Sequence, residues 1–461
     1  MRLAIYLFCS MFCVLAFGEQ KEQPPEGGPP KPFRLAPTQD VTLANGMRIT
    51  LVPYGIVPRV AIRAYVSAGG VNEAANQVWL SRLTGLLMKE GTTTRTAEQV
   101  AQQAANAGGQ LEIKPDVEFT TVGGVALSDH AAQFVDLVAD VLQHPLLPAS
   151  EAPRLKADLA RELAVAKAQP NQLARERFLQ ILFPDSPYGR MFPAETELQG
   201  YKVEDVQAFY RGNFSAARTH LYISGKLDPG LLDAVKKAFA GWPKGAPPVS
   251  MAAKMNKGHA FALIDRPDAP QSTLYIGLLV ADPSSPDYIP QEVMNALLGG
   301  SFASRITSNI REQKGYTYSP RSEVETRVHV GYWVEIADVT TTVTGPSMKE
   351  IFYEIDRLRK EPPSEAELKG IQTYLAGLFV LRNTISPDAV IGQLHFVDSQ
   401  GLNRSYLTAY VQKVTAVKPQ DIQSIAEKYL PPGKMAIVVV GDKSKIADQV
   451  KPYEAGQMAD N

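Results

Sequence analysis

Alternation of apolar and polar positions predicts a β-hairpin at the start of the folded region. Residues 41–52 form two alternating runs that meet at Asn45-Gly46, a pair that favours the tight turn of a hairpin. Further strands are predicted at 60–66, 117–127 and 219–225. Apolar residues at helical spacing predict helices at 80–89, 97–107, 131–143, 151–167 and 230–239. The first half of the chain therefore has the pattern of an α+β domain.

The same plan begins again after 241–258, a segment rich in Pro, Gly and Lys that is typical of a linker. The pattern beyond it predicts strands at 259–265, 271–280 and 331–337. Helices are predicted at 291–298, 350–359 and 365–381. The second half thus also reads as α+β.

An internal repeat relates the two halves. A helix beginning Val203-Glu204-Asp205 is followed by a strand that ends at Gly225, and a helix beginning Pro419-Gln420-Asp421 is followed by a strand that ends at Gly441, at one constant offset. Duplication of one folding unit explains this arrangement. We therefore expect two similarly folded α+β domains at 38–240 and 259–450, joined by the linker at 241–258 and followed by a tail at 451–461.

The first residues have the pattern of an export signal. Arg2 precedes an apolar run that ends at small residues near position 18, and this run is shorter than the roughly 20 residues that span a bilayer. Residues 1–18 are therefore predicted to be a signal peptide, and the Pro-rich residues 19–37 an extended tether. We expect an exported protein, periplasmic or extracellular, with no membrane-spanning segment after signal removal.

Charge and cysteine content narrow the possible functions. Lys and Arg total 47 against 48 Asp and Glu, and this balance argues against a nucleic-acid partner held by bulk electrostatics. Hydrophobic residues make up 45% of the chain, as expected for a folded protein with large cores. Both cysteines, Cys9 and Cys13, lie in the predicted signal peptide, so the mature chain is expected to lack disulfides and a thiol nucleophile.

With these elements the chain resembles the pitrilysin/insulinase family of zinc peptidases, which includes the mitochondrial processing peptidase subunits, over nearly all of 38–450. The first elements of the first domain follow the family's order: an Asn-Gly hairpin, a strand, and a helix that ends before Gly91-Thr92. In catalytic members this helix carries H-x-x-E-H, in which two His bind the metal and the Glu activates its water. The five positions hold Arg82-Leu83-Thr84-Gly85-Leu86. The resemblance thus implies a degenerate metal site in which Arg82, Gly85 and Leu86 replace His, Glu and His.

The family's third metal ligand is a Glu on a later helix, and Glu162 fits that place. A solvated helix residue is the alternative interpretation of Glu162. Catalytic zinc takes three protein ligands, so one carboxylate cannot hold it. The chain contains neither H-x-x-E-H nor H-x-x-x-H, and its histidines are isolated along the sequence: His130, His144, His220, His259, His329 and His395. We expect no metal and no catalytic residue on this chain alone, with zinc on a partner chain.

The second domain resembles the part of the family that binds substrate. Gly299 and Gly300 precede a helical segment that carries Arg311, and Tyr318 follows it. In the family, an Arg and a Tyr at this spacing reach the zinc site of the other half, where a guanidinium and a phenol act as donors to the polarised carbonyl. The resemblance implies a substrate-binding role for these four residues. The alternative is structural, with Arg311 capping a helix and Tyr318 filling a strand face.

The resemblance implies a non-catalytic subunit of an exported zinc metallopeptidase. Its partner would be a homologous chain bearing H-x-x-E-H, and together they would hydrolyse a peptide or unfolded polypeptide bound as an added β-strand. Three alternatives remain: a peptide-binding or chaperone-like module, a structural subunit of a larger complex, and an active peptidase with a different catalytic apparatus. The lack of a mature cysteine and of a histidine cluster argues against the last.

Overall fold

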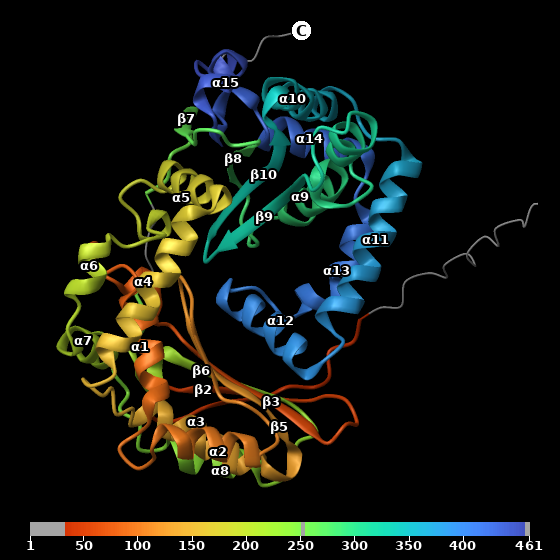
Figure 1. The fold of residues 1–461 in the computed structure, drawn as a ribbon. Helices are drawn as coiled ribbons and strands as arrows, with labels where there is room; N and C mark the ends of the chain where they lie inside the picture. The colour runs from red at the N-terminus through yellow and green to blue at the C-terminus, as the bar shows by residue number, and fades with distance from the viewer. Residues whose placement is uncertain (1–32, 250–253, 457–461) are drawn as a thin grey trace, which may run out of the picture. The chain divides into compact units, whose positions relative to one another are not determined.

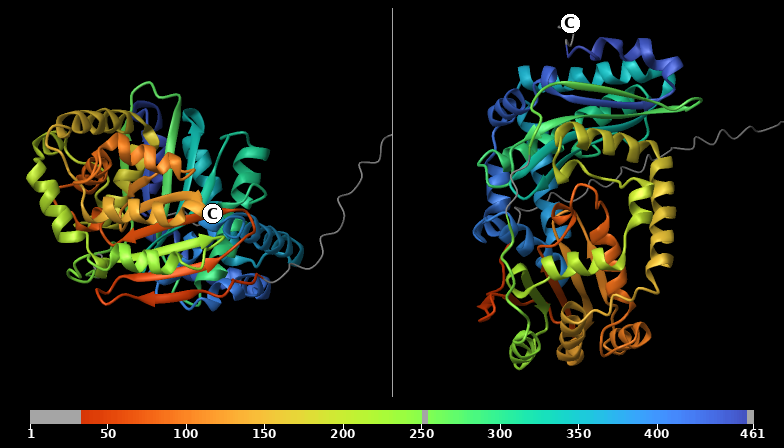
Figure 2. Two further views of the ribbon diagram at one scale, coloured as in Figure 1. Left: turned by 90° about the horizontal axis from the view of Figure 1, so that it is seen from below. Right: turned by 90° about the vertical axis from the view of Figure 1, so that its left-hand side faces the viewer.

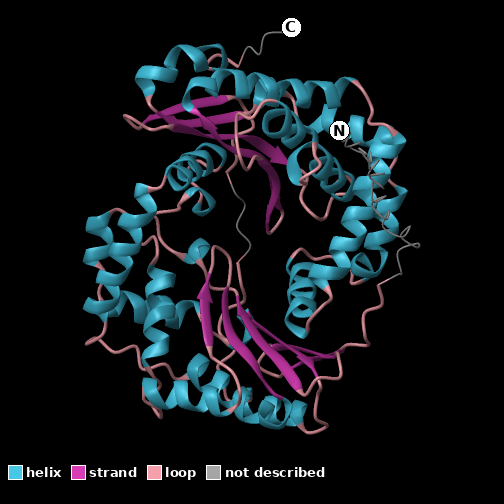
Figure 3. Cartoon of the chain, turned by 45° about the vertical axis from the view of Figure 1, so that its right-hand side comes forward, coloured by secondary structure: helices cyan, strands magenta, loops and turns pink. Residues whose placement is uncertain are grey.

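The computed structural model of this chain describes residues 33–249 and 254–456, which contain two mixed β-sheets (Figures 1 and 3). The first sheet has the order β1-β2-β6-β3-β5-β4. Its strands are β1 (Gln39–Thr42), β2 (Arg48–Pro53), β3 (Arg59–Val66), β4 (Glu112–Pro115), β5 (Thr120–Leu127) and β6 (Thr219–Gly225). The helices in this half are α1 (Leu80–Leu87), α2 (Ala97–Asn106), α3 (Ala131–Gln143), α4 (Ala152–Ala168), α5 (Pro170–Leu182), α6 (Glu195–Gly200), α7 (Val203–Asn213) and α8 (Leu231–Phe239).

The second sheet has the order β7-β11-β8-β10-β9. Its strands are β7 (Ala260–Asp265), β8 (Gln271–Val280), β9 (Arg321–Arg327), β10 (Val330–Thr340) and β11 (Ala436–Gly441). Its helices are α9 (Tyr288–Asn295), α10 (Thr344–Lys360), α11 (Glu365–Asn383), α12 (Pro387–Ser399), α13 (Ser405–Ala416), α14 (Pro419–Tyr429) and α15 (Lys443–Val450). Two π-helical segments, Ala296–Gly300 and Thr307–Gln313, follow α9.

The predicted duplication is confirmed by the sheet topology. Apart from the edge strand β1, both sheets have the same order, with one parallel pair, β2–β6 in the first and β7–β11 in the second. The repeated helices also begin in the same way. The carboxylate of Asp205 accepts from the backbone N–H of Lys202 at 2.8 Å, and that of Asp421 accepts from Lys418 at 2.9 Å. A carboxylate in the first turn satisfies an unpaired N–H and favours the positive end of the helix dipole.

Each sheet is covered on one face by a helix from the other half of the chain. Phe178 and Leu182 of α5 pack against Tyr332 and Val438 of the second sheet. Figure 2 shows two further views of the ribbon. In return, α12 lies on the face of the first sheet that carries Tyr65 and Tyr222, called here the α12 face. The opposite face of that sheet buries its residues against α1, α3, α7 and α8. The two halves therefore share their cores.

The predicted elements are largely present, with some corrections. The hairpin at Asn45-Gly46 forms, with Thr42 opposite Arg48. The strand expected at 117–127 begins only at Thr120. The short strand β4 and the helices α5 and α12 were not expected, although β4 and α12 contribute to the sites described below.

Two segments expected to be free are partly packed. At the described end of the predicted tether 19–37, Phe33 packs edge-on against Phe379 with ring centroids 5.7 Å apart. Within the predicted linker, Trp242 is buried in the first core. The carbonyls of Pro243 and Lys244 accept from the backbone of Ala216 and Ala217. The predicted signal peptide lies outside the described residues. Among residues 33–249 and 254–456, no helix is both long enough and apolar enough to cross a bilayer.

Candidate functional site

The helix that corresponds to the family's metal helix is α1, and a buried carboxylate fixes where it begins. Glu73 accepts from the backbone N–H groups of Trp79 at 3.0 Å and of Ser81 at 2.7 Å, and from the Ser81 hydroxyl at 2.5 Å. Burial raises the pKa of Glu73, although these donors oppose the rise. Trp79 takes a left-handed backbone conformation with φ of 72° just before the helix.

An ion pair occupies the place expected for the metal. Nη2 of Arg82 lies 2.5 Å from Oε1 of Glu162, which projects from α4, and the Arg82 guanidinium also lies 4.2 Å from the centroid of the Trp79 ring. The structure thus brings together the first position of the degenerate motif and the position of the third ligand. The Glu162 side chain is 53% exposed, as a solvated helix residue would be, and its carboxylate faces the fixed positive charge of Arg82. A guanidinium here neutralises the carboxylate as a bound cation would.

The remaining two motif positions cannot coordinate a metal. Gly85 is buried against β4, and a Cβ built on it would lie 2.5 Å from Cγ and 2.9 Å from Cδ of Pro115. A side chain at this position therefore has no space unless the helix or the strand moves. Leu86 is half-buried and packs against the first core. Arg82, Gly85 and Leu86 thus do not fit zinc. Throughout the described ranges, no three His, Cys, Asp or Glu side chains lie close enough together to hold a metal ion.

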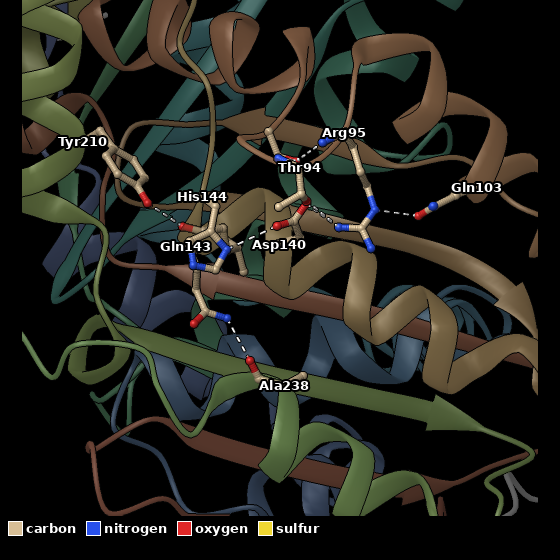
Figure 4. Close-up of polar contacts among 10 residues, drawn as sticks. Thr94, Arg95, Gln103, Asp140, Gln143, His144, Tyr210 and Ala238 are labelled. Atoms are coloured by element: carbon tan, nitrogen blue, oxygen red, sulfur yellow. Dashed lines mark hydrogen bonds and ion pairs between the residues drawn. The ribbon is translucent and has the colours of Figure 1, made fainter.

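A polar network holds the turn after α1 in place (Figure 4). Gly91 has φ of 114°, and the backbone N–H of Thr92 then donates to the carbonyl of Arg95 at 2.8 Å. Asp140 of α3 accepts from Arg95 at 2.5 Å and lies 3.2 Å from the His144 ring. Burial alone would raise the pKa of Asp140, but hydrogen bonds from Thr92 and Arg95 hold this pKa below its ordinary value. These hydrogen bonds hold the turn at Gly91-Thr92 in one conformation.

The glycine pair of the second half is explained by packing. A Cβ on Gly299 would lie 2.5 Å from Oγ of Ser322 and 2.7 Å from Oε2 of Glu335, while one on Gly300 would meet the Asn295 amide. Glu335 is fully buried, and neither of its carboxylate oxygens has a hydrogen-bond partner among the described residues. Burial raises the pKa of Glu335 well above its ordinary value. A role of these glycines in guiding substrate stays a prediction.

The predicted substrate-binding pair forms an exposed stack. The Arg311 guanidinium lies 4.6 Å from the ring centroid of Phe302 and 5.0 Å from that of Tyr318. Tyr318 is 78% exposed and Phe302 67% exposed, so Tyr318 does not fill a strand face. Across the described ranges, no hydrogen bond or ion pair links Arg311 or Tyr318 to the α1 helix or to Glu162. The stack is thus available to a ligand or to another chain.

Two histidines that are isolated in the sequence come together in the structure. The His395 ring of α12 stacks on Tyr65 with centroids 3.6 Å apart, and the His220 ring stacks on Tyr222 at 3.9 Å. The centroids of Tyr222 and His395 are 6.1 Å apart. Both histidines line one cavity on the α12 face of the first sheet. Nothing in their sequence spacing indicated this, because α12 itself was not predicted.

Two models of one protein family match most of this chain. Residues 56–193 match the model of the insulinase (peptidase family M16) domain, and residues 201–375 match the model of the peptidase M16 inactive domain. The chain belongs to the M16, or insulinase, peptidase family.

Its relatives in this family are distant. A protein of Rickettsia felis described as an uncharacterised zinc protease is 22% identical over 400 residues, which cover 84% of this chain and 93% of the relative. A probable mitochondrial-processing peptidase subunit beta of Arabidopsis thaliana is 21% identical and covers 90% of this chain and 80% of its own length. The crystal structure of a peptidase M16 inactive domain from Pseudomonas fluorescens superposes with a TM-score of 0.81 at 22% identity, covering 88% of this chain and 98% of that chain. The likeness in structure confirms the predicted fold of two α+β domains.

Proposed function

We propose that this chain is a non-catalytic member of the M16 family that binds peptides and works with a metal-bearing partner chain. The observation that carries the proposal is the ion pair between Arg82 of α1 and Glu162 of α4. On the same helix as Arg82, Gly85 has no space for a side chain. Hydrolysis by this family's motif needs two imidazole ligands and a carboxylate base on that helix. None of the three is present, and packing opposes the return of the carboxylate.

The exposed stack of Phe302, Arg311 and Tyr318 supports a role in substrate binding. Arg311 is positioned by two aromatic faces, and its Nε lies 3.2 Å from the carboxylate of the neighbouring Glu312. Guanidinium N–H groups and the Tyr318 hydroxyl can donate to a peptide carbonyl. A preorganised donor pair of this kind suits the polarised carbonyl of a substrate held by another chain.

Unpaired sheet edges support binding of an extended peptide. β4 pairs only with β5, and β9 pairs only with β10, in the part of the chain that is described. An edge strand offers N–H and C=O groups to a peptide that is added as a further strand. We therefore propose a peptide or unfolded polypeptide as the substrate, a homologous chain with H-x-x-E-H as the partner and carrier of zinc, and an exported location.

Reconstitution with a homologous H-x-x-E-H chain from the same organism tests this proposal. The mixture is expected to cleave peptides while this chain alone does not. Arg311→Ala and Tyr318→Phe should each lower turnover by about 100-fold, the usual effect of losing one preorganised donor. Tyr353→Phe is the matched control, because Tyr353 is also an exposed tyrosine, on α10. Thermal melting and co-elution show whether each variant folds and assembles.

Three results would contradict the proposal. Hydrolysis by this chain alone with bound zinc would show that it is catalytic. Wild-type turnover by both variants in an intact pair would assign the stack a structural role. If peptides bind but no partner assembles, the second candidate, a stand-alone peptide-binding module, replaces the heterodimer. The cavity on the α12 face favours this second candidate, because residues of this chain line it without a partner.

A further inference from the structure

Two adjoining cavities lie at the α12 face of the first sheet: one between that face and α12, and a larger one that extends to Val71, Tyr188 and Val328. The smaller has a volume of about 50 Å³ and is lined by Arg48, Arg218, His220 and His395, among others. The larger has a volume of about 290 Å³. The two share Arg48 and Phe119 in their walls and so adjoin. Neither cavity involves the α1 helix or the Arg311 stack.

Two arginines at this site lack acidic partners. Arg218 is 7% exposed, and its Nη1 donates to the carbonyl of Ser67 at 2.7 Å and to the Asn213 side chain at 3.2 Å. Its Nε and Nη2 have no hydrogen-bond partner among the described residues, and desolvation lowers its pKa. Arg48, on β2 beside His220 of β6, makes no side-chain hydrogen bond or ion pair within the same ranges. For the buried Arg218, a guanidinium without a counter-charge is costly and an anion removes that cost, whereas Arg48 is exposed and adds a second positive charge.

The histidines add a neutral donor. His395 lies between Tyr65 and Phe119, and its ring nitrogens have no hydrogen-bond partner in the described part of the chain. Burial, together with the positive charge of Arg48, lowers the pKa of His395 to about 3 and that of His220 to about 2. Both rings are therefore neutral at pH 7, and each carries one N–H. His220 already contacts the Thr50 hydroxyl at 2.9 Å, so His395 is the free donor.

Carboxylates also line the larger cavity, but they have their own donors. Asp398 accepts from the Tyr222 hydroxyl at 2.7 Å and lies 3.6 Å from Arg404. Glu118 accepts from the Tyr188 hydroxyl at 2.6 Å and from a backbone N–H at 2.8 Å. Their lone pairs are thus partly satisfied, whereas the donors of Arg48, Arg218 and His395 are not. Unmatched donors at this site thus include two charged guanidinium groups, beside one unmatched ring nitrogen, Nδ1 of His220.

We propose that Arg48, Arg218 and His395 bind a carboxylate, and that this is the C-terminal carboxylate of a peptide whose last residue lies in the larger cavity. Arginine guanidinium groups match a carboxylate in geometry and charge. The larger cavity is at the lower limit of small-molecule sites, about 300 Å³, so it accepts a chain end and not an extended strand. The peptide part rests on the proposed function, whereas the carboxylate part does not.

Calorimetric titration of the full chain tests the site with matched ligands. One tetrapeptide is used as the free acid and as the C-terminal amide, with sodium acetate and inorganic phosphate as small anions. The free acid should bind at least tenfold more tightly than the amide, because the amide loses a charge-assisted hydrogen bond. Arg48→Gln and His395→Phe should abolish this preference. His395→Phe keeps a ring against Tyr65, and Arg48 is exposed, so both variants should fold.

Arg59→Gln is the matched control, since Arg59 is an exposed strand arginine outside the cavity, and it should keep the preference. Equal binding of free acid and amide, or a preference that survives Arg48→Gln, overturns the inference. Equal binding of this kind would leave the proposed peptide function intact. Acetate or phosphate binding that depends on Arg48, without peptide binding, would instead refute the peptide terminus and the proposed function together. A preference that depends on Arg48 supports the inference whether or not a metal-bearing partner exists.

Discussion

Replacement of Gly85 by Ala tests the packing that closes the degenerate metal helix. Gly85 lies inside α1, where Ala normally gains about 1 kcal/mol over Gly in helix propensity. Here the added Cβ would lie 2.5 Å from Cγ of Pro115, about 1 Å closer than a relaxed carbon contact. Overpacking of this kind costs about 1–3 kcal/mol, so the expected gain is cancelled or reversed.

Gly370→Ala supplies the reference value. Gly370 lies inside α11, and a Cβ there would meet nothing within 4 Å, so this variant should be stabilised by about 1 kcal/mol. The difference in the free energy of unfolding between the two variants is expected to be about 1–3 kcal/mol. Urea denaturation followed by tryptophan fluorescence measures it, because Trp79 directly precedes α1.

A double-mutant cycle with Pro115→Ala locates the clash. Removal of the proline ring should recover most of the loss in the Gly85→Ala background, which appears as a coupling energy between the two positions. If Gly85→Ala stabilises the chain as much as Gly370→Ala does, the steric argument is refuted. A carboxylate could then fit at position 85, and the proposal of a non-catalytic chain would rest on Arg82 and Leu86 alone.

Three further predictions concern metal content, pH and proteolysis. After mild chelation, elemental analysis should find well under one zinc per chain, because Arg82 neutralises Glu162; one tightly held zinc would contradict this. Burial raises the pKa of Glu292 from 4.5 to about 7, so the native state binds this proton more tightly than the unfolded state, and stability should fall as pH rises between these values. Glu292→Gln should remove up to about 3 kcal/mol of that fall in urea titrations at pH 4.5 and 7.5, and an unchanged pH dependence would count against the assignment. Limited proteolysis should first cut within 246–258, since Trp242 is buried, and mass spectrometry of fragments that end before Trp242 would disprove this.

The sequence alone was sufficient for features that depend on neighbouring residues. The hairpin at Asn45-Gly46 and the repeated helix starts at Asp205 and Asp421 are set by turn and cap chemistry within a few positions. The degenerate motif at Arg82 was found by resemblance to a family, from residues that are neighbours in the sequence. Glu162 was placed by resemblance to a family, and the structure joined it to Arg82.

Tertiary structure decided the features that join distant segments. The lack of space at Gly85 depends on Pro115 of β4, a short strand that the pattern did not predict. The cavity on the α12 face depends on α12, in which no residue from 389 to 399 is exposed, so its apolar residues do not mark a single buried face. Arg48 and His395 line one cavity only because a helix of one half covers the sheet of the other. Local patterns specify which elements form, whereas the docking of two cores specifies which side chains share a site.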